Sequence, residues 1–143
     1  MKSIIRFFQL NFFPRSVDLA LLVLRIWLGA TMLLNHGMGK LRGFGQMADK
    51  FFDPFGMGPS VSLGLAIFAE VVCAALLALG LLTRFAALVL VVLTGVAFFM
   101  FHKNALSGPS SGELAFIYMA GFVAIFLAGP GRFSVDRKLG GAA

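Results

Sequence analysis

Four long runs of apolar residues divide this chain, separated by short stretches rich in glycine, proline and charged residues. The runs cover residues 17–39, 60–82, 85–101 and 114–128, and each approaches the ~20 residues that a helix needs to cross the hydrocarbon core of a bilayer. None of them alternates between apolar and polar positions as a half-buried strand does. Because a spanning segment must satisfy its backbone hydrogen bonds internally, the pattern predicts an all-α fold. We expect a four-helix transmembrane bundle in one domain over residues 1–143.

Composition agrees with a location in the lipid bilayer. Apolar residues make up 59% of the chain, charged residues only 13%, and the mean hydropathy is +0.94, whereas soluble domains carry about 25% charged residues. The net charge of +6 does not indicate nucleic acid as a partner, because the basic residues lie mainly between the apolar runs rather than in a basic stretch with interleaved aromatics. The single cysteine, Cys73, excludes an internal disulfide.

The distribution of charge between the runs predicts the orientation of the bundle. The turn around residues 82–84 is short, so the second and third helices form an antiparallel pair. Because connecting segments rich in positive charge favour the cytoplasmic side, we expect both termini to lie in the cytoplasm. The membrane is expected to be a bacterial-type plasma (inner) membrane. Seven basic residues lie on the side of the termini and four on the other side: Lys2, Arg6, Arg15, Arg84, Arg132, Arg137 and Lys138 against Lys40, Arg42, Lys50 and Lys103.

The first run is preceded by residues 3–14, where Arg6 stands among four phenylalanines. We expect this part of the chain to form an amphipathic segment at the membrane interface.

Two charged residues lie inside these apolar runs, Arg25 in the first and Glu70 in the second. A charge at the centre of a spanning helix costs roughly 2.5–3.5 kcal/mol by insertion scales, so such residues normally pair, face a cavity or take part in chemistry. With a rise of 1.5 Å per residue, Arg25 lies about 14 Å from the cytoplasmic start of its helix and Glu70 about 18 Å from the cytoplasmic end of its own. The sequence therefore predicts an Arg25–Glu70 ion pair, either as a structural clamp or as the floor of a polar cavity.

Further polar residues extend from this depth toward the outer side. In the first helix, Arg25, Gly29, Met32, His36 and Lys40 follow one another at steps of three or four residues, which places them on one face. Gly29 on this face would let a neighbouring helix or a ligand approach closely.

The third and fourth helices add His102 and Glu113 at the outer side, so these residues are expected to converge with His36 and Lys40 above Glu70. Simpler roles stay open: His36 as a packing residue, and Glu113 as part of a capping box beginning at Ser110.

The chemistry that this cluster suggests is the binding of a small redox-active or lipophilic ligand. No His or Glu spacing typical of a metal site occurs, so no metal is expected, and the sequence has no phosphate loop or dinucleotide fingerprint. We expect Arg25, His36, Lys40 and His102 to bind the ligand. The catalytic candidates, which would handle protons, are His36, Glu70 and Glu113.

Four blocks of the chain carry a recognisable set of motifs. They are residues 24–29 (LRIWLG) with 36–37 (HG) and 40–41 (KL), Glu70 with residues 79–84 (LGLLTR), residues 112–115 (GELA), and residues 129–136 (GPGRFSVD). Together these blocks resemble the DoxX family of integral membrane proteins over about residues 18–137, apart from Phe133, where the family often has tyrosine. The motif residues that carry over are Arg25, His36, Lys40, Glu70, Arg84 and Glu113.

The resemblance implies a four-helix membrane fold and a loose association with redox chemistry. Relatives include the small subunit of an archaeal thiosulfate:quinone oxidoreductase, and others are linked with membrane complexes that handle sulfur or oxidative stress. The first hypothesis is therefore a subunit of, or accessory to, a quinone-linked oxidoreductase that uses a quinone and a redox partner protein. The alternative is a non-catalytic membrane scaffold that recruits a soluble redox or stress enzyme. A transporter of small solutes or metal ions is a third hypothesis, and it would need a homo-oligomer.

Overall fold

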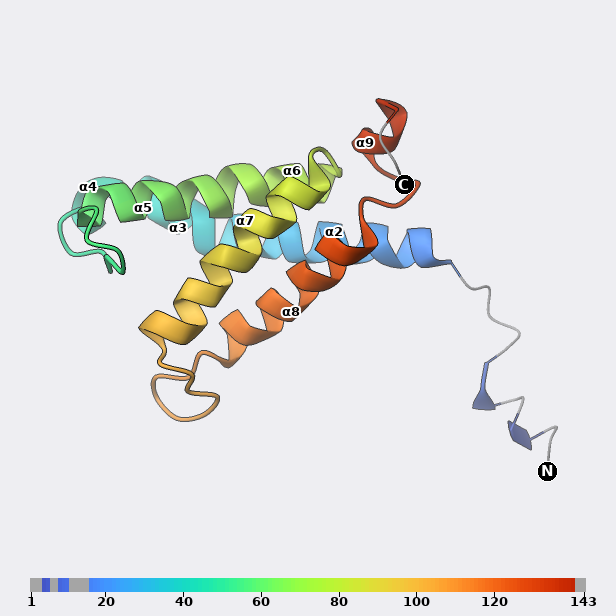
Figure 1. Cartoon of the computed structure of the whole chain (residues 1–143), viewed down its shortest axis with the longest axis horizontal. Helices are drawn as coiled ribbons and strands as arrows, with labels where there is room; N and C mark the ends of the chain where they lie inside the picture. The colour runs from blue at the N-terminus through green and yellow to red at the C-terminus, as the bar shows by residue number, and fades with distance from the viewer. Residues whose placement is uncertain (1–3, 6–7, 11–15, 141–143) are drawn as a thin grey trace.

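A computed structural model of the chain describes residues 4–5, 8–10 and 16–140. Within these residues every regular element is a helix (Figure 1). The first spanning region joins α2 (Val17–Thr31), the π-helix η1 (Met32–Gly37) and α3 (Met38–Arg42), and the second joins α5 (Pro59–Ile67), the π-helix η2 (Phe68–Cys73) and α6 (Ala74–Leu79). The third joins α7 (Thr83–Val96) and the π-helix η3 (Ala97–Phe101), and the fourth is α8 (Glu113–Ala128). Two short helices, α4 (Phe44–Met47) and α9 (Val135–Lys138), lie outside these regions.

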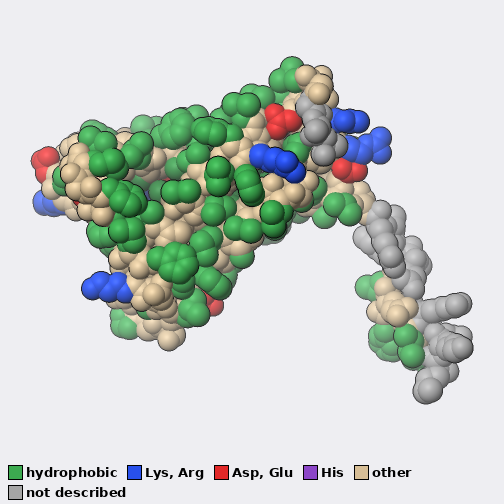
Figure 2. All heavy atoms as spheres, in the orientation of Figure 1, with side chains coloured by type: hydrophobic (Ala, Val, Ile, Leu, Met, Phe, Trp, Pro, Cys, Tyr) green, Lys and Arg blue, Asp and Glu red, His purple; other side chains and the backbone are tan. Residues whose placement is uncertain are grey.

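The lengths and composition of these regions are those of an integral membrane protein. Three continuous helices, Val17–Arg42, Pro59–Leu79 and Thr83–Phe101, are long and apolar enough to cross a bilayer. The fourth is apolar but has only 16 residues, about 24 Å at the usual rise. Apolar side chains cover much of the surface between the ends of the molecule (Figure 2). The predicted four-helix membrane bundle is thereby confirmed. Most of the expected interfacial segment 3–14 falls outside the described residues and stays a prediction.

Two helix ends differ by three residues from the sequence prediction. The first helix continues to Arg42, three residues beyond the predicted end. The second ends at Leu79 because Gly80 takes a left-handed conformation, with φ of 72°. Glycine adopts this conformation at little cost and commonly terminates helices.

The four regions form two antiparallel pairs (Figure 1). The first region runs along the second, and α7 lies against α8, so that this second pair crosses the first at an angle. We call the end that holds the start of α2, the α6–α7 connection and α9 the terminal end, and the end with the connections 43–58 and 102–112 the loop end. The pairs lie close together at the terminal end and diverge toward the loop end.

Close contact within the first pair depends on two buried glycines of the first region. A Cβ atom added to Gly29 would lie 2.7 Å from the carbonyl oxygen of Ala74, and one added to Gly37 would lie 2.6 Å from that of Glu70. Only glycine permits such proximity of two helix backbones. The expected role of Gly29 is confirmed, and the pair of contacts fixes how the two helices align.

The terminal end is tied together by polar contacts of side chains with the backbone. The side chain of Arg25 is fully buried, and its Nη2 donates a hydrogen bond of 2.7 Å to the carbonyl of Phe133. The carboxylate of Asp136 accepts hydrogen bonds from the backbone amides of Leu82 (2.7 Å) and Thr83 (2.9 Å). These contacts hold the C-terminal segment against the connection between the second and third helices.

Candidate functional site

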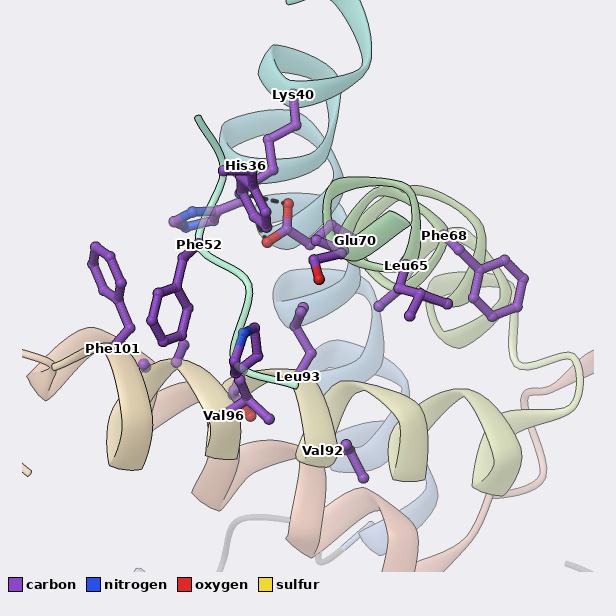
Figure 3. Close-up of a pocket in the computed structure, with 18 of the residues that line it drawn as sticks. His36, Lys40, Phe52, Leu65, Phe68, Glu70, Val92, Leu93, Val96 and Phe101 are labelled. Carbon is purple, nitrogen blue, oxygen red and sulfur yellow. Dashed lines mark hydrogen bonds and ion pairs between the residues drawn. The ribbon is translucent and has the colours of Figure 1, made fainter. Parts of the chain in front are cut away.

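A cavity of about 1100 Å³ lies between the two diverging helix pairs at the loop end (Figure 3). Its walls come from η1 and α3, from α5 and η2, from α7 and η3, and from the start of α8, and the connection 46–57 lines its loop end. Most of the lining is apolar or aromatic. The lining aromatic side chains are Phe51, Phe52, Phe55, Phe68, Phe101 and Tyr118.

One side of this cavity carries a compact group of polar side chains. The Nζ atom of Lys40 lies 2.9 Å and 2.7 Å from the two carboxylate oxygens of Glu70. Both residues are largely withdrawn from solvent, since the side chain of Lys40 is 21% exposed and that of Glu70 only 8%. The half-buried ring of His36 lies one helical turn from Lys40 and meets the ring of Tyr118 edge-on, with centroids 5.7 Å apart. Figure 3 shows His36, Lys40 and Glu70 next to one another. We call these three residues the polar cluster.

Three π-helical segments surround the cavity, and each presents a lining residue. His36 belongs to η1, Glu70 to η2 and Phe101 to η3. A π-helical turn inserts an extra residue into an α-helix and redirects the side chains around it, and such turns are frequent at functional sites. η1 and η2 lie side by side within the first pair, η3 ends the third region at the loop end, and all three border the same cavity.

The expected Arg25–Glu70 ion pair is wrong, because Glu70 pairs with Lys40 and Arg25 with backbone carbonyls at the terminal end. The prediction assumed that the first two helices begin and end at the same level, but they are offset along their axes. The backbone of Glu70 lies against Gly37, and Gly80 lies against the side chain of Arg25. Arg25 and Gly37 are separated by about 18 Å along their helix. Moreover, the Cβ atoms of a helix tilt toward its own N-terminus. In an antiparallel pair the two side chains therefore point toward opposite ends, Arg25 to the terminal end and Glu70 to the loop end.

Four of the six candidate site residues line the cavity together: His36, Lys40, Glu70 and His102. His102 lies at its edge, where Nδ1 is 2.8 Å from the carbonyl oxygen of Ser110. Arg25 and Glu113 are not among the lining residues. Arg25 is buried at the terminal end, and Glu113 is exposed on the first turn of α8.

The expected capping box at the start of the fourth helix does not form. It would place Glu113 in the third position of the helix, but α8 begins at Glu113 itself. The backbone amide of Glu113 instead donates to the hydroxyl of Ser111, at 3.2 Å. The carboxylate of Glu113 therefore has no capping role in the described structure.

Tyr118 is a lining residue that the sequence did not reveal. It is the single tyrosine of the chain, it is 8% exposed, and its ring stacks on Phe122. Its position midway along an apolar helix resembled that of any packing aromatic. Only the contact of its ring with His36 indicates that Tyr118 belongs to the candidate site.

The polar cluster and the apolar walls of the cavity suit an organic ligand. Among the residues that the structure describes, no three His, Cys, Asp or Glu side chains gather closely enough to hold a metal ion. The cluster offers an ammonium, a carboxylate and an imidazole on one side of an apolar space. Such a space suits a ligand with a polar head and an apolar body.

The fold and this cavity define an integral membrane protein with a ligand-sized pocket inside its helix bundle. Comparison with known proteins identifies its family: the DoxX family matches residues 20–103, and the chain belongs to it. The chain is 32% identical over 126 residues to the inner membrane protein YqjF of Escherichia coli, covering 85% of this chain and 93% of that protein. It is 31% identical over 128 residues to an uncharacterized protein of Haemophilus influenzae, covering 84% of this chain and 83% of that protein. No solved structure matches the chain significantly.

Proposed function

We propose that the cavity binds a quinone, and that the protein is a subunit of, or accessory to, a quinone-linked oxidoreductase of sulfur or oxidative-stress metabolism. The observation that carries the proposal is the polar cluster on one side of an otherwise apolar cavity of about 1100 Å³. A quinone has two carbonyl acceptors on a flat apolar ring, so it needs donors on a small part of its surface and apolar contact elsewhere. The inner membrane is the proposed location, as the name of the Escherichia coli relative states for that protein, with both termini in the cytoplasm.

The three residues of the polar cluster have distinct parts in this proposal. Lys40 and the protonated form of His36 can donate hydrogen bonds to a carbonyl oxygen. Glu70 holds the ammonium of Lys40 in place at 2.7 Å and can accept a proton. A bound quinone supplies two-electron, two-proton chemistry, and His36 with Glu70 would hold the protons beside it. The proposed partner protein supplies or removes the electrons.

The proposal is tested by ligand binding to the purified protein in lipid nanodiscs. Decyl-tailed benzoquinone should raise the thermal stability of the wild type, and quinone should be found in lipid extracts of the protein. His36→Ala should weaken binding by tenfold or more, a loss of about 1.4 kcal/mol. Asn35→Ala is the matched control, because Asn35 is the exposed neighbour of His36 and does not line the cavity.

Two results would contradict the proposal. One is wild-type protein that contains no quinone and shows no change in thermal stability when quinone is added. The other is equal weakening of binding by Asn35→Ala and His36→Ala.

The scaffold alternative remains distinguishable, and one observation favours it: Lys40 and Glu70 satisfy each other, as a structural clamp would. A scaffold would retain a co-purifying soluble enzyme when both residues are replaced by glutamine. A quinone-binding subunit would instead lose its ligand in the same variant.

A further inference from the structure

The connection 46–57 lines the cavity at the loop end. In it, Phe52 meets Phe101 of η3 edge-on with ring centroids 5.3 Å apart. The carboxylate of Asp53 fastens this connection to the start of α5, accepting hydrogen bonds from the hydroxyl of Ser62 (2.8 Å) and the amide of Gly58 (2.7 Å). Asp53 lies outside the spanning segments, and the hydrogen bond from Ser62 is the main reason that its pKa is lowered. The carboxylate therefore stays ionised and keeps the connection attached to the start of α5 at neutral pH.

The cavity also reaches the surface between the second and third spanning helices. In α5, η2 and α7, four apolar residues line the cavity and are at the same time exposed on the surface: Leu65 (52%), Phe68 (41%), Leu88 (46%) and Val92 (57%). They lie within two spanning helices. In Figure 3, Leu65 and Phe68 lie on one side and Val92 on the helix opposite. We call the opening between these two helices the lateral portal. At this depth the portal opens onto hydrocarbon rather than water.

From this geometry we propose that the ligand is a single-tailed amphiphile that enters from the bilayer through the lateral portal and leaves its apolar tail there. The identity of its head rests on the proposed function, and the tail and the route go beyond it. The polar cluster receives the head, and Leu65, Phe68 and Val92 surround the first part of the tail. The volume agrees, because about 1100 Å³ lies just above the 300–1,000 Å³ typical of small-molecule pockets and is more than a single ring fills. A water-soluble substrate would instead enter between the aromatic side chains of the loop end.

The tail gains no hydrophobic free energy by moving from lipid into the portal, because lipid tails are equally apolar. A tailed ligand therefore binds more strongly to membrane-embedded protein mainly through its concentration in the lipid. For this reason the test compares variants and not only ligands. Val92→Trp narrows the portal, and Val23→Trp is its control, since Val23 is 51% exposed on α2 and does not line the cavity.

Three probes are used with protein in nanodiscs: decyl-tailed benzoquinone, the same ring with methyl in place of decyl, and decyl-tailed dimethoxybenzene. Val92→Trp should weaken binding of both tailed probes at least tenfold and change binding of the tail-less ring less than twofold. Val23→Trp should leave all three unchanged. Leu65→Trp, on the opposite helix, should repeat the Val92→Trp result if the two residues border the same portal.

The outcomes separate this inference from the proposed function. Tailed dimethoxybenzene has no quinone carbonyls. If it binds as strongly as the tailed quinone and Val92→Trp weakens its binding, the result supports the portal and contradicts a quinone site. Failure of both tailed probes to bind overturns the portal, as does equal weakening of tailed and tail-less rings by Val92→Trp. A wild-type dimer in detergent that Val92→Trp dissociates would place a second copy of the chain over the portal, which also overturns the proposal.

Discussion

Removing either partner of the Lys40–Glu70 ion pair should destabilise the protein, but by clearly different amounts. Lys40→Met leaves a carboxylate whose side chain is only 8% exposed. Truncating one partner of a buried pair costs about 3–5 kcal/mol, because the remaining charge is left uncompensated. We therefore expect Lys40→Met to lower the free energy of unfolding by an amount in this range.

Glu70→Gln should cost less. The ammonium of Lys40 is already 21% exposed, and its four-carbon stem can carry the charge toward water at the loop end while the stem stays on apolar surface. The remaining cost is that of an imperfectly satisfied donor, about 1–3 kcal/mol. The two single variants should therefore differ by roughly 2 kcal/mol, with the double variant less destabilised than Lys40→Met alone.

The assay is equilibrium unfolding in mixed micelles, followed by helical circular dichroism. Arg42→Met is the matched control, because Arg42 lies on the same short helix, α3, is exposed and makes no ion pair among the described contacts. Its effect should stay within about 0.5 kcal/mol. Equal costs for the two single variants, or a double variant equal to their sum, would refute the view that Glu70 is the buried member and depends on Lys40.

Two further predictions concern the helix contact and the terminal end. Gly37→Ala should destabilise the protein by about 1–3 kcal/mol in the same unfolding assay, because its Cβ would lie 2.6 Å from the carbonyl oxygen of Glu70 and the helices must separate; Gly39→Ala, with no atom within 4 Å of its Cβ, should not. Burial acts to raise the pKa of Asp136, but hydrogen bonds from Thr83 and Leu82 outweigh it, so the pKa lies below the ordinary 3.8. A lowered folded-state pKa gives stability that is fully present above pH 3.8 and is lost as the pH falls further. Thermal unfolding between pH 5 and 2.5 should show this loss in wild type, and Asp136→Asn should reduce it; an unchanged acid profile would contradict the role of this carboxylate.

Most of the membrane fold could be predicted from local properties of the chain. The number of spans, their approximate bounds and the reversal of direction between the second and third helices follow from hydropathy, length and turn residues, which depend on neighbours in sequence. Gly29 was correctly expected at a close helix contact because a glycine on an otherwise substituted face has few other uses. The exact end of the second helix depended on the left-handed Gly80, and the sequence did not distinguish that glycine from its apolar neighbours.

The sequence by itself determined that Arg25 and Glu70 would need partners, because a charge in hydrocarbon is costly wherever it lies. Tertiary structure decided which partners they have. The offset between the first two helices, set by Gly29 and Gly37, and the opposite tilt of side chains in an antiparallel pair send Glu70 to Lys40 and Arg25 to the C-terminal segment. The angle between the helix pairs and the three π-helical segments then open the cavity beside His36. These features arise from packing between distant segments, for which hydropathy and spacing along one chain carry no signal.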